Sequence, residues 1–126
     1  MNALAFFWVG CGGAVGACSR YAVALAMGRN LSWLATLGVN IAGCLLLGML
    51  WQYCTERYPI WWATTGAPLF ATGFCGAFTT MSAFALETRN LATQFGTLQA
   101  GSYVIASVTL SLVALLIGIV IVKAIV

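Results

Sequence analysis

Four long apolar segments, separated by short polar connections, fill almost the whole of this chain. Of its 126 residues, 63% are hydrophobic and only 6% are charged, whereas soluble domains carry roughly 25% charged residues. A helix needs about 20 apolar residues to cross a bilayer. The segments therefore predict an all-α, polytopic membrane protein with four transmembrane helices. We expect these helices at residues 3–27, 32–53, 61–90 and 98–123, in one transmembrane domain over residues 1–126.

Ionisable side chains are too few for most enzyme chemistry. His is absent, and the only acidic residues are Glu56 and Glu87. Metalloenzyme, proton-shuttle and Ser-His-Asp mechanisms therefore lack their parts, and we expect no enzymatic activity. The net charge of +3 is spread one residue at a time, which predicts no nucleic-acid partner. The five cysteines form no Cys-x-x-Cys pair, so we interpret them as small apolar packing residues.

The third segment is expected to be broken near residues 74–80. If fully helical at 1.5 Å per residue, residues 61–90 would measure about 45 Å, more than the ~30 Å hydrocarbon core. Gly66, Pro68 and the glycine- and threonine-rich run 73–80 mark where tilt or a break takes up the excess. Non-helical backbone at membrane depth persists only inside protein or beside water. The break is therefore a candidate ion site, because half-helix ends and unwound carbonyls bind ions in transport proteins.

The first segment holds two further candidates. Gly12 and Gly16 lie four residues apart, a spacing that lets two helix backbones approach closely. Packing within one subunit and packing between subunits are both open. Arg20 lies in the same apolar run, and an intramembrane arginine is by default a functional-site hypothesis. Snorkelling of its side chain to the near interface is the alternative.

Polar residues at helical spacing mark the second and fourth segments. Thr36 and Asn40 share one helix face, and the Asn40 amide can donate two hydrogen bonds and accept two. Asn40 either lines a pore or bonds one helix to another. In the fourth segment, Tyr103, Ser107 and Ser111 recur every fourth residue and form one stripe of hydroxyls. The stripe either lines a polar track or bonds backbone carbonyls.

The cationic residues are balanced across the membrane. With four spans, Arg57 and Lys123 lie on one side, and Arg29 and Arg89 lie on the other. This balance gives no positive-inside preference, so both insertion orientations are expected. Two oppositely inserted copies can then pair about a two-fold axis in the membrane plane, as an antiparallel (dual-topology) dimer.

Motifs in all four segments together resemble the Fluc (CrcB) family of fluoride channels. In chain order they are GxxxGxxxRY over residues 12–21, TxxxNxxGxxxxG over residues 36–48, GFCGxxTTxSxFxxE over residues 73–87, and the hydroxyl stripe of the fourth segment. The resemblance implies a multi-pass protein of the bacterial cell (inner) membrane. It also implies passive export of toxic cytoplasmic fluoride through two pores at an antiparallel dimer interface, with fluoride and the lipid bilayer as partners.

The resemblance further implies a role for each candidate residue. Asn40 and Ser107 are expected to donate hydrogen bonds to fluoride, and Arg20 to supply positive potential near the vestibule. A structural Na⁺ on the dimer axis is the expected cofactor, held by the backbone carbonyls of Gly76 and Thr79. The expected fluoride pore consists of Thr36, Asn40, Thr80, Met81, Ser82, Phe84, Tyr103, Ser107 and Ser111.

The chain departs from the family at the break. The family usually reads Thr-Phe-Ser-Thr-Phe where residues 80–84 read Thr-Met-Ser-Ala-Phe. Met81 therefore replaces one of the paired phenylalanines, of which Phe84 is the other, and Ala83 replaces a hydroxyl. A homodimer and a heterodimer with a paralogue are both consistent with this departure.

Two other functions remain as alternatives. A small multidrug resistance-type dual-topology transporter has a similar size and span number. It would need a glutamate in the middle of the first helix, and the nearest acid here is Glu56. A non-transporting membrane assembly subunit would use the Gly12 and Gly16 face and the hydroxyl faces only for packing. Such a subunit would not require a broken third helix.

Overall fold

The structure is a computed structural model that describes residues 3–126, and it contains four helical spans of membrane-crossing length. The spans cover Ala3–Met27, Arg29–Arg57, Trp62–Phe95 and Thr97–Ile125. No strand occurs among the described residues. The prediction of an all-α protein with four transmembrane helices is therefore confirmed.

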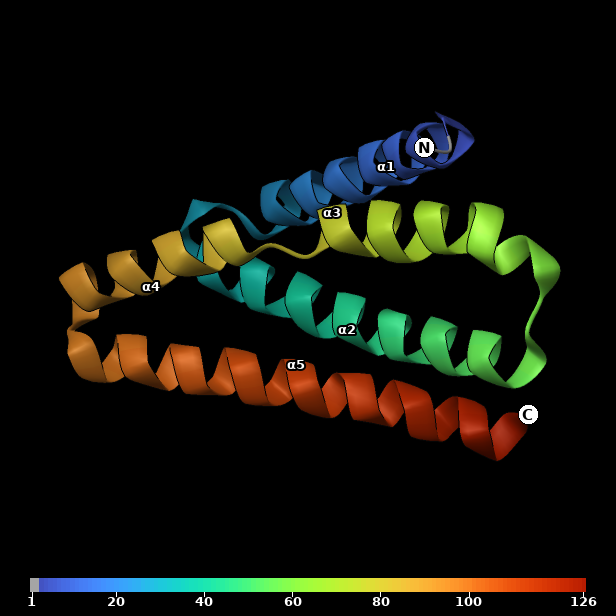
Figure 1. The fold of residues 1–126 in the computed structure, drawn as a ribbon. Helices are drawn as coiled ribbons and strands as arrows, with labels where there is room; N and C mark the ends of the chain where they lie inside the picture. Colours follow the sequence, from blue (N-terminus) through green and yellow to red (C-terminus); the bar gives the residue numbers. More distant parts are fainter. Residues whose placement is uncertain (1–2) are drawn as a thin grey trace.

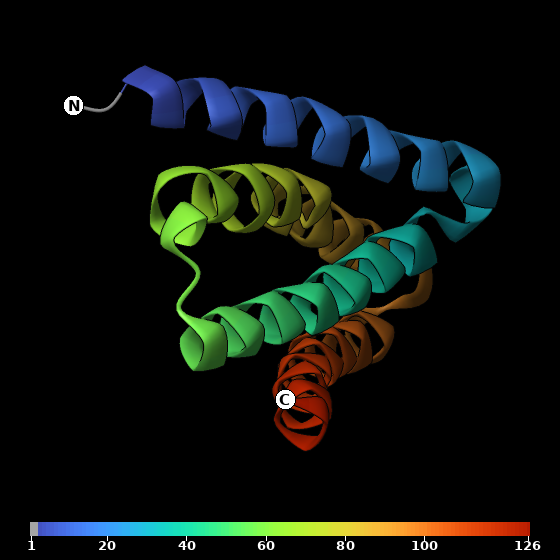
Figure 2. The same cartoon turned by 90° about the vertical axis from the view of Figure 1, so that its right-hand side faces the viewer.

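Three of the spans are continuous or nearly so. The first is α1 (Ala3–Met27), the second joins the short turn η1 (Arg29–Leu31) to α2 (Ser32–Arg57), and the fourth is α5 (Thr97–Ile125). Figure 1 places the N-terminus, the C-terminus and the connection after α2 at one end of the molecule, and the two other turns at the opposite end. Figure 2 shows α1 lying beside the third span, which it contacts along η2.

The third span is broken in the middle. It consists of η2 (Trp62–Cys75), α3 (Gly76–Phe78) and α4 (Met81–Phe95). Thr79 and Thr80 are extended, with φ/ψ of −79°/160° and −154°/119°, and join α3 to α4. The predicted break is thus confirmed and is confined to two residues. Gly66 and Pro68 lie before this break, where the backbone leaves the α-helical form and passes Pro68 in the wide turns of a π-helix, η2.

Glycines hold α1 against η2. A Cβ atom at Gly12 would overlap the carbonyl oxygen of Leu69, and a Cβ atom at Gly16 would overlap that of Phe74. Both glycines are buried within the single chain. The structure therefore decides between the two alternatives for this pair, in favour of packing inside one subunit.

A second glycine contact fixes the register of α2 against α5. A Cβ atom at Gly48 would overlap the carbonyl oxygen of Leu115, and one at Gly118 would overlap that of Leu45. The two helices run in the same direction (Figure 1). Nearer the starts of both helices, Asn40 on α2 and Ser107 on α5 line one cavity.

The outer surface is apolar. Exposed large hydrophobic side chains occur along all four spans, including Phe6, Trp51, Leu86 and Leu116. Contiguous apolar surface of this kind suits lipid and not water. Together with the four spans, it identifies a multi-pass membrane protein.

Candidate functional site

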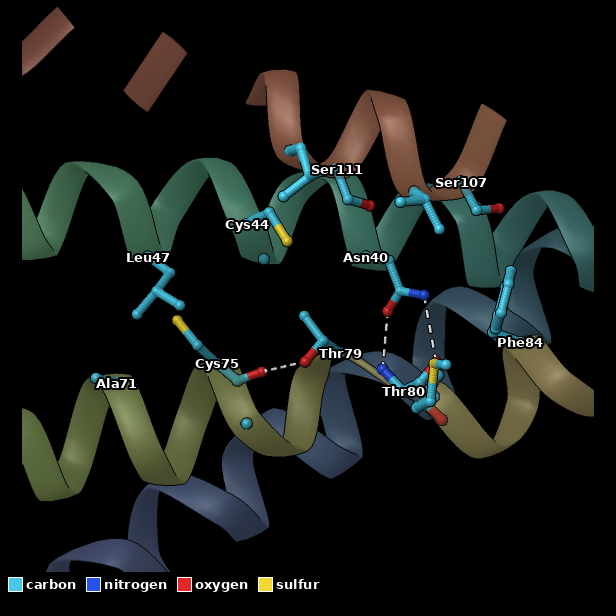
Figure 3. A pocket seen from close by; sticks show the side chains of 15 residues that line it. Asn40, Cys44, Leu47, Ala71, Cys75, Thr79, Thr80, Phe84, Ser107 and Ser111 are labelled. Atoms are coloured by element: carbon cyan, nitrogen blue, oxygen red, sulfur yellow. Dashed lines mark hydrogen bonds between the residues drawn. The ribbon is translucent and has the colours of Figure 1, made fainter. Parts of the chain in front are cut away.

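A cavity of about 390 Å³ lies between α2, α5 and the broken third span. Figure 3 shows side chains of α2 and α5 facing the break across this space. None of the described residues that line it is acidic or basic, so an ion here would be held by dipoles, hydrogen bonds and backbone groups. The lining consists of Asn40, Gly43, Cys44, Leu47, Ala71, Cys75, Gly76, Thr79, Thr80, Met81, Phe84, Ser107, Val108, Ser111 and Leu112.

Asn40 makes two hydrogen bonds to the backbone of Thr80 (Figure 3). Its Nδ2 donates to the Thr80 carbonyl oxygen at 3.2 Å, and the Thr80 amide donates to its Oδ1 at 2.8 Å. Asn40 thus satisfies two backbone groups that the break removes from the helical ladder. An Asn amide has two N–H donors, so one remains for another acceptor. The sequence left open whether Asn40 bonds one helix to another or lines a pore. In the structure its side chain bonds α2 to the third span and also lines the cavity.

Threonine side chains order the backbone on either side of the break. The Thr80 hydroxyl oxygen accepts from the Ala83 amide at 3.2 Å, which caps α4, and it lies 3.2 Å from the Ser82 hydroxyl. The Thr79 hydroxyl and amide both donate to the Cys75 carbonyl oxygen, at 2.9 Å and 3.0 Å. Short hydroxyl side chains at a helix start are good caps, so the local sequence itself favours a new helix after Thr80.

Arg20 contacts the first half of the broken span. Its Nε donates to the Ala77 carbonyl oxygen at 3.1 Å. Ala77 lies in α3, directly before the break, where carbonyls lose their helical donors and the helix dipole is negative. The Arg20 side chain is therefore engaged at the site, and snorkelling alone does not describe it.

Aromatic rings form one wall beside the cavity. Phe84 is only 9% exposed, and its ring centroid lies 5.5 Å from that of Tyr103 with a tilt of 31°. Tyr103 in turn makes an edge contact with Trp33, at 6.2 Å and 89°. Met81 lines the same cavity as Phe84 but is 74% exposed in the single chain.

Two hydroxyls of the α5 stripe are buried without a partner in the described chain. The side-chain oxygens of Ser107 and Tyr103 make no hydrogen bond within residues 3–126, although the two residues are only 4% and 5% exposed. An unsatisfied buried hydroxyl costs about 1–3 kcal/mol. The alternative that the stripe bonds backbone carbonyls does not hold for these two residues, and Ser107 is part of the cavity wall.

A protein-family model described as "CrcB-like protein, Camphor Resistance (CrcB)" matches residues 7–119. The chain belongs to the CrcB family. The "Fluoride-specific ion channel FluC" of Paracoccus denitrificans is 43% identical over 115 residues, which cover 90% of each chain. A protein with the same name from Magnetococcus marinus is 39% identical over 124 residues, covering 90% of this chain and 94% of its own. Another from Rhizobium etli (strain CIAT 652) is 35% identical over 122 residues, covering 94% and 95%.

Gly76 of this CrcB-family chain has an ordinary helical backbone, with φ −62° and ψ −35°. A Cβ atom there would meet nothing closer than the Ala71 carbonyl oxygen at 3.9 Å, an ordinary contact. Within the single chain, neither a positive φ nor a close contact requires glycine at this position. Gly76 is instead exposed, on a surface open enough to accept another chain.

The cavity gathers most but not all of the predicted site residues. Those that line it are Asn40, Gly76, Thr79, Thr80, Met81, Phe84, Ser107 and Ser111. Thr36 is buried one turn before the cavity begins. Ser82 is exposed, and its hydroxyl contacts that of Thr80. Tyr103 lines a separate cavity of about 280 Å³, next to Trp33. Arg20 reaches the break through Ala77, outside the cavity lining.

The cavity wall also includes residues that the sequence-based prediction missed. Cys44 and Cys75 both line it, and both are free thiols. Helical spacing offered a signal, because Cys44 follows Asn40 by four residues and Cys75 precedes Thr79 by four. These two cysteines therefore do more than pack within apolar helices, because their side chains form part of the cavity wall beside the break.

Proposed function

We propose that this protein is a fluoride-selective ion channel that exports toxic cytoplasmic fluoride by passive conduction. The observation that most supports the proposal is the buried, unpartnered hydroxyl of Ser107 beside an uncharged cavity that Asn40 also lines. CrcB-family relatives named as fluoride-specific ion channels align with at least 90% of this chain in three bacteria.

The chemistry of the cavity suits a small, strongly hydrated anion. Such an ion must exchange its water for hydrogen-bond donors, and the free N–H of Asn40 and the Ser107 hydroxyl are donors. The Phe84 ring can add an electropositive edge. A cavity without carboxylates neither repels the anion nor provides the mid-membrane acid that coupled transporters usually have.

The two alternative functions fit the chain less well. A small multidrug resistance-type transporter would need an acidic residue in its first helix, and Ala3–Met27 contains none. An assembly subunit would have no use for a broken span stabilised by Asn40 and Arg20 from two other helices. Neither alternative explains a buried hydroxyl left unpaired at a cavity wall.

The channel would be an antiparallel, dual-topology dimer in the bacterial inner membrane. The balance of Arg57 and Lys123 against Arg29 and Arg89 supports insertion both ways up. Gly76 and Met81 line the cavity and yet are exposed, which supports a second copy closing it from outside. A homodimer needs no other gene product, and a heterodimer with a paralogue is the alternative because Met81 departs from the family pattern.

A structural Na⁺ on the dimer axis would complete the site. The carbonyls of Gly76 and Thr79 fit this role, because Thr79 is extended and the open face of Gly76 leaves room for the matching carbonyls of a second copy. Unwound carbonyls and half-helix ends are the groups that coordinate Na⁺ in transport proteins. When bound, the ion would supply positive charge that offsets the desolvation of fluoride.

The remaining candidate residues would each have a role along the fluoride pathway. Arg20 would add positive potential beside the break, and Phe84 would face the anion. Met81 would keep the passage closed to lipid and to larger anions. The hydroxyl-bearing residues along the pathway would be Thr36, Thr80, Ser82, Tyr103, Ser107 and Ser111.

A growth assay tests the proposal in cells. A bacterium deprived of its own fluoride exporter should regain growth in fluoride when it produces this protein, and an empty vector should not rescue it. A Thr93→Ala variant is a matched control, because Thr93 is exposed and bonds only the Asn90 carbonyl of its own helix. If the protein restored growth in high chloride or in a cationic drug, but not in fluoride, the assignment would be overturned.

A further inference from the structure

We infer that the side chains of Asn40 and Thr80 are positioning residues for the cation site. They take up the two backbone amides that would otherwise pair with the carbonyls of Gly76 and Thr79. This inference rests on the proposed sodium site and does not depend on how fast fluoride is conducted. It assigns to two cavity residues a task separate from contact with the anion.

Asn40 leaves the Gly76 carbonyl without its helical donor. In a continuous α-helix, the amide of residue 80 would donate to the carbonyl of residue 76. Here the Thr80 amide donates to Asn40 Oδ1 at 2.8 Å, and the bond from Asn40 Nδ2 to the Thr80 carbonyl holds the pair together. Without Asn40, the amide would be free to bond Gly76 again and lengthen α3 across the break.

The Thr80 hydroxyl does the same for Thr79. A continuous helix would pair the amide of residue 83 with the carbonyl of residue 79. Instead the Ala83 amide donates to Thr80 Oγ1 at 3.2 Å, so the first turn of α4 is capped by a side chain. The two diverted amides correspond to the two carbonyls that the sodium proposal requires.

Arg20 narrows the choice of carbonyls further. The carbonyl of Ala77, between Gly76 and Thr79, is bonded to the Arg20 guanidinium at 3.1 Å. A guanidinium there both uses the oxygen and repels a second cation. The Ala77 oxygen is therefore less accessible to a cation than the oxygens of Gly76 and Thr79, which no side chain of the described residues bonds.

Asn40 consequently couples the two ions. Its Oδ1 and one N–H form hydrogen bonds to the backbone of Thr80 in the break. Its second N–H remains for the anion in the cavity. Ser107 lines the same cavity without bonding to the break. Loss of the Asn40 side chain should therefore weaken the binding of both the cation and the anion, whereas loss of the Ser107 hydroxyl should weaken only the binding of the anion.

Thermal unfolding of the purified protein in detergent tests this inference without a flux measurement. Na⁺ is added to a background of N-methyl-D-glucamine chloride, and the concentration giving half of the Na⁺-dependent rise in Tm is compared among variants. A ligand that binds only the folded state raises Tm in this way. For Asn40→Leu and Thr80→Val we expect this concentration to rise about tenfold or more, since each loses the bond that keeps a carbonyl free.

Conservative variants separate positioning from general damage. Thr80→Ser keeps the hydroxyl and should stay within about threefold of the wild type. Asn40→Asp keeps an oxygen for the Thr80 amide, so its Na⁺ response should be retained while its fluoride efflux falls. Ser107→Ala should lose efflux with an unchanged Na⁺ response. If Asn40→Leu fails to fold, the Thr80→Val and Thr80→Ser pair decides the question.

Two failures are distinguishable. Folded Asn40→Leu and Thr80→Val proteins with the Na⁺ response of the wild type would overturn this inference alone. If the Tm of the wild-type protein rises no more with Na⁺ than with the control cations K⁺ and N-methyl-D-glucamine, the sodium proposal and this inference are both overturned. Absence of fluoride efflux beside a normal Na⁺ response would instead overturn the channel assignment.

Discussion

The Nε atom of Arg20 donates to the carbonyl oxygen of Ala77 at 3.1 Å, joining residues that lie 57 positions apart in the chain. The bond ties the first span to the last turn before the break in the third. A charged donor at this place complements the negative end of the short helix and occupies a carbonyl that the break leaves without a helical donor. Arg20 therefore has a structural task at the site as well as an electrostatic one.

Replacing Arg20 with Met should remove both the bond and the charge. Hydrogen bonds to charged groups are worth about 1.5–3 kcal/mol, so the free energy of unfolding should fall by about that amount. Arg20→Lys keeps the charge and should lie between Met and the wild type in fluoride efflux. Thermal unfolding and efflux measured on the same preparations check this. Arg89→Met is the control, because Arg89 is exposed; an Arg20→Met protein as stable and as fast as that control would contradict the assigned task.

Phe84 and Met81 should differ in their importance for conduction. Phe84 is 9% exposed beside Tyr103 and can present a ring edge to the cavity, whereas Met81 is 74% exposed and offers a thioether. We expect Phe84→Leu to lower fluoride efflux by about tenfold, and Met81→Phe to conduct at least as fast as the wild type with selectivity over chloride intact. A harmless Phe84→Leu together with an inactive Met81→Phe would show that the anion does not use ring edges here.

The glycines of α1 should fall into two classes. Gly12→Ala places a methyl group against the Leu69 carbonyl and should destabilise the protein by about 1–3 kcal/mol through overpacking. Gly10 lies on the same helix, and a Cβ atom there would meet nothing within 4 Å. Gly10→Ala should therefore leave the protein unchanged or raise its stability by up to about 1 kcal/mol. Thermal unfolding in detergent measures both, and equal effects would contradict the packing of α1 on η2.

Both insertion orientations should be found in cells. A cysteine introduced as Ile60→Cys, at a residue that is 95% exposed in the connection after α2, reports the orientation after the five native cysteines are replaced. A membrane-impermeant maleimide should label about half of the molecules from each side, because the cationic residues are balanced. Labelling from one side only would exclude an antiparallel homodimer and leave the heterodimer with a paralogue.

The fold could be predicted largely from the sequence because lipid imposes few solutions. Apolar runs of spanning length, with few charges inside them, define the four spans, and glycine with threonine marks the broken one. The extent of the break could not be read in the same way. It depends on the contact of Asn40 with Thr80, 40 residues apart, and on π-helical turns that carry the backbone past Pro68.

Which predicted site residues line the cavity of the single chain depends on packing. Thr36 shares a helix face with Asn40, but the cavity begins only at Asn40, so the shared face does not make Thr36 a lining residue. Tyr103 continues the stripe of Ser107 but lies in a second cavity, beside Trp33. The choice between an internal and an external role for Gly12 likewise required the position of η2.

Fluoride efflux from liposomes that contain only the purified protein tests the central proposal most directly. Vesicles are loaded with fluoride and chloride, and each ion is followed with its own electrode after a cation ionophore removes the electrical limit. We expect rapid release of fluoride, chloride retained as in protein-free vesicles, and release slowed by Ser107→Ala. Retention of fluoride by vesicles that contain folded protein, or equal release of both anions, would contradict the proposal.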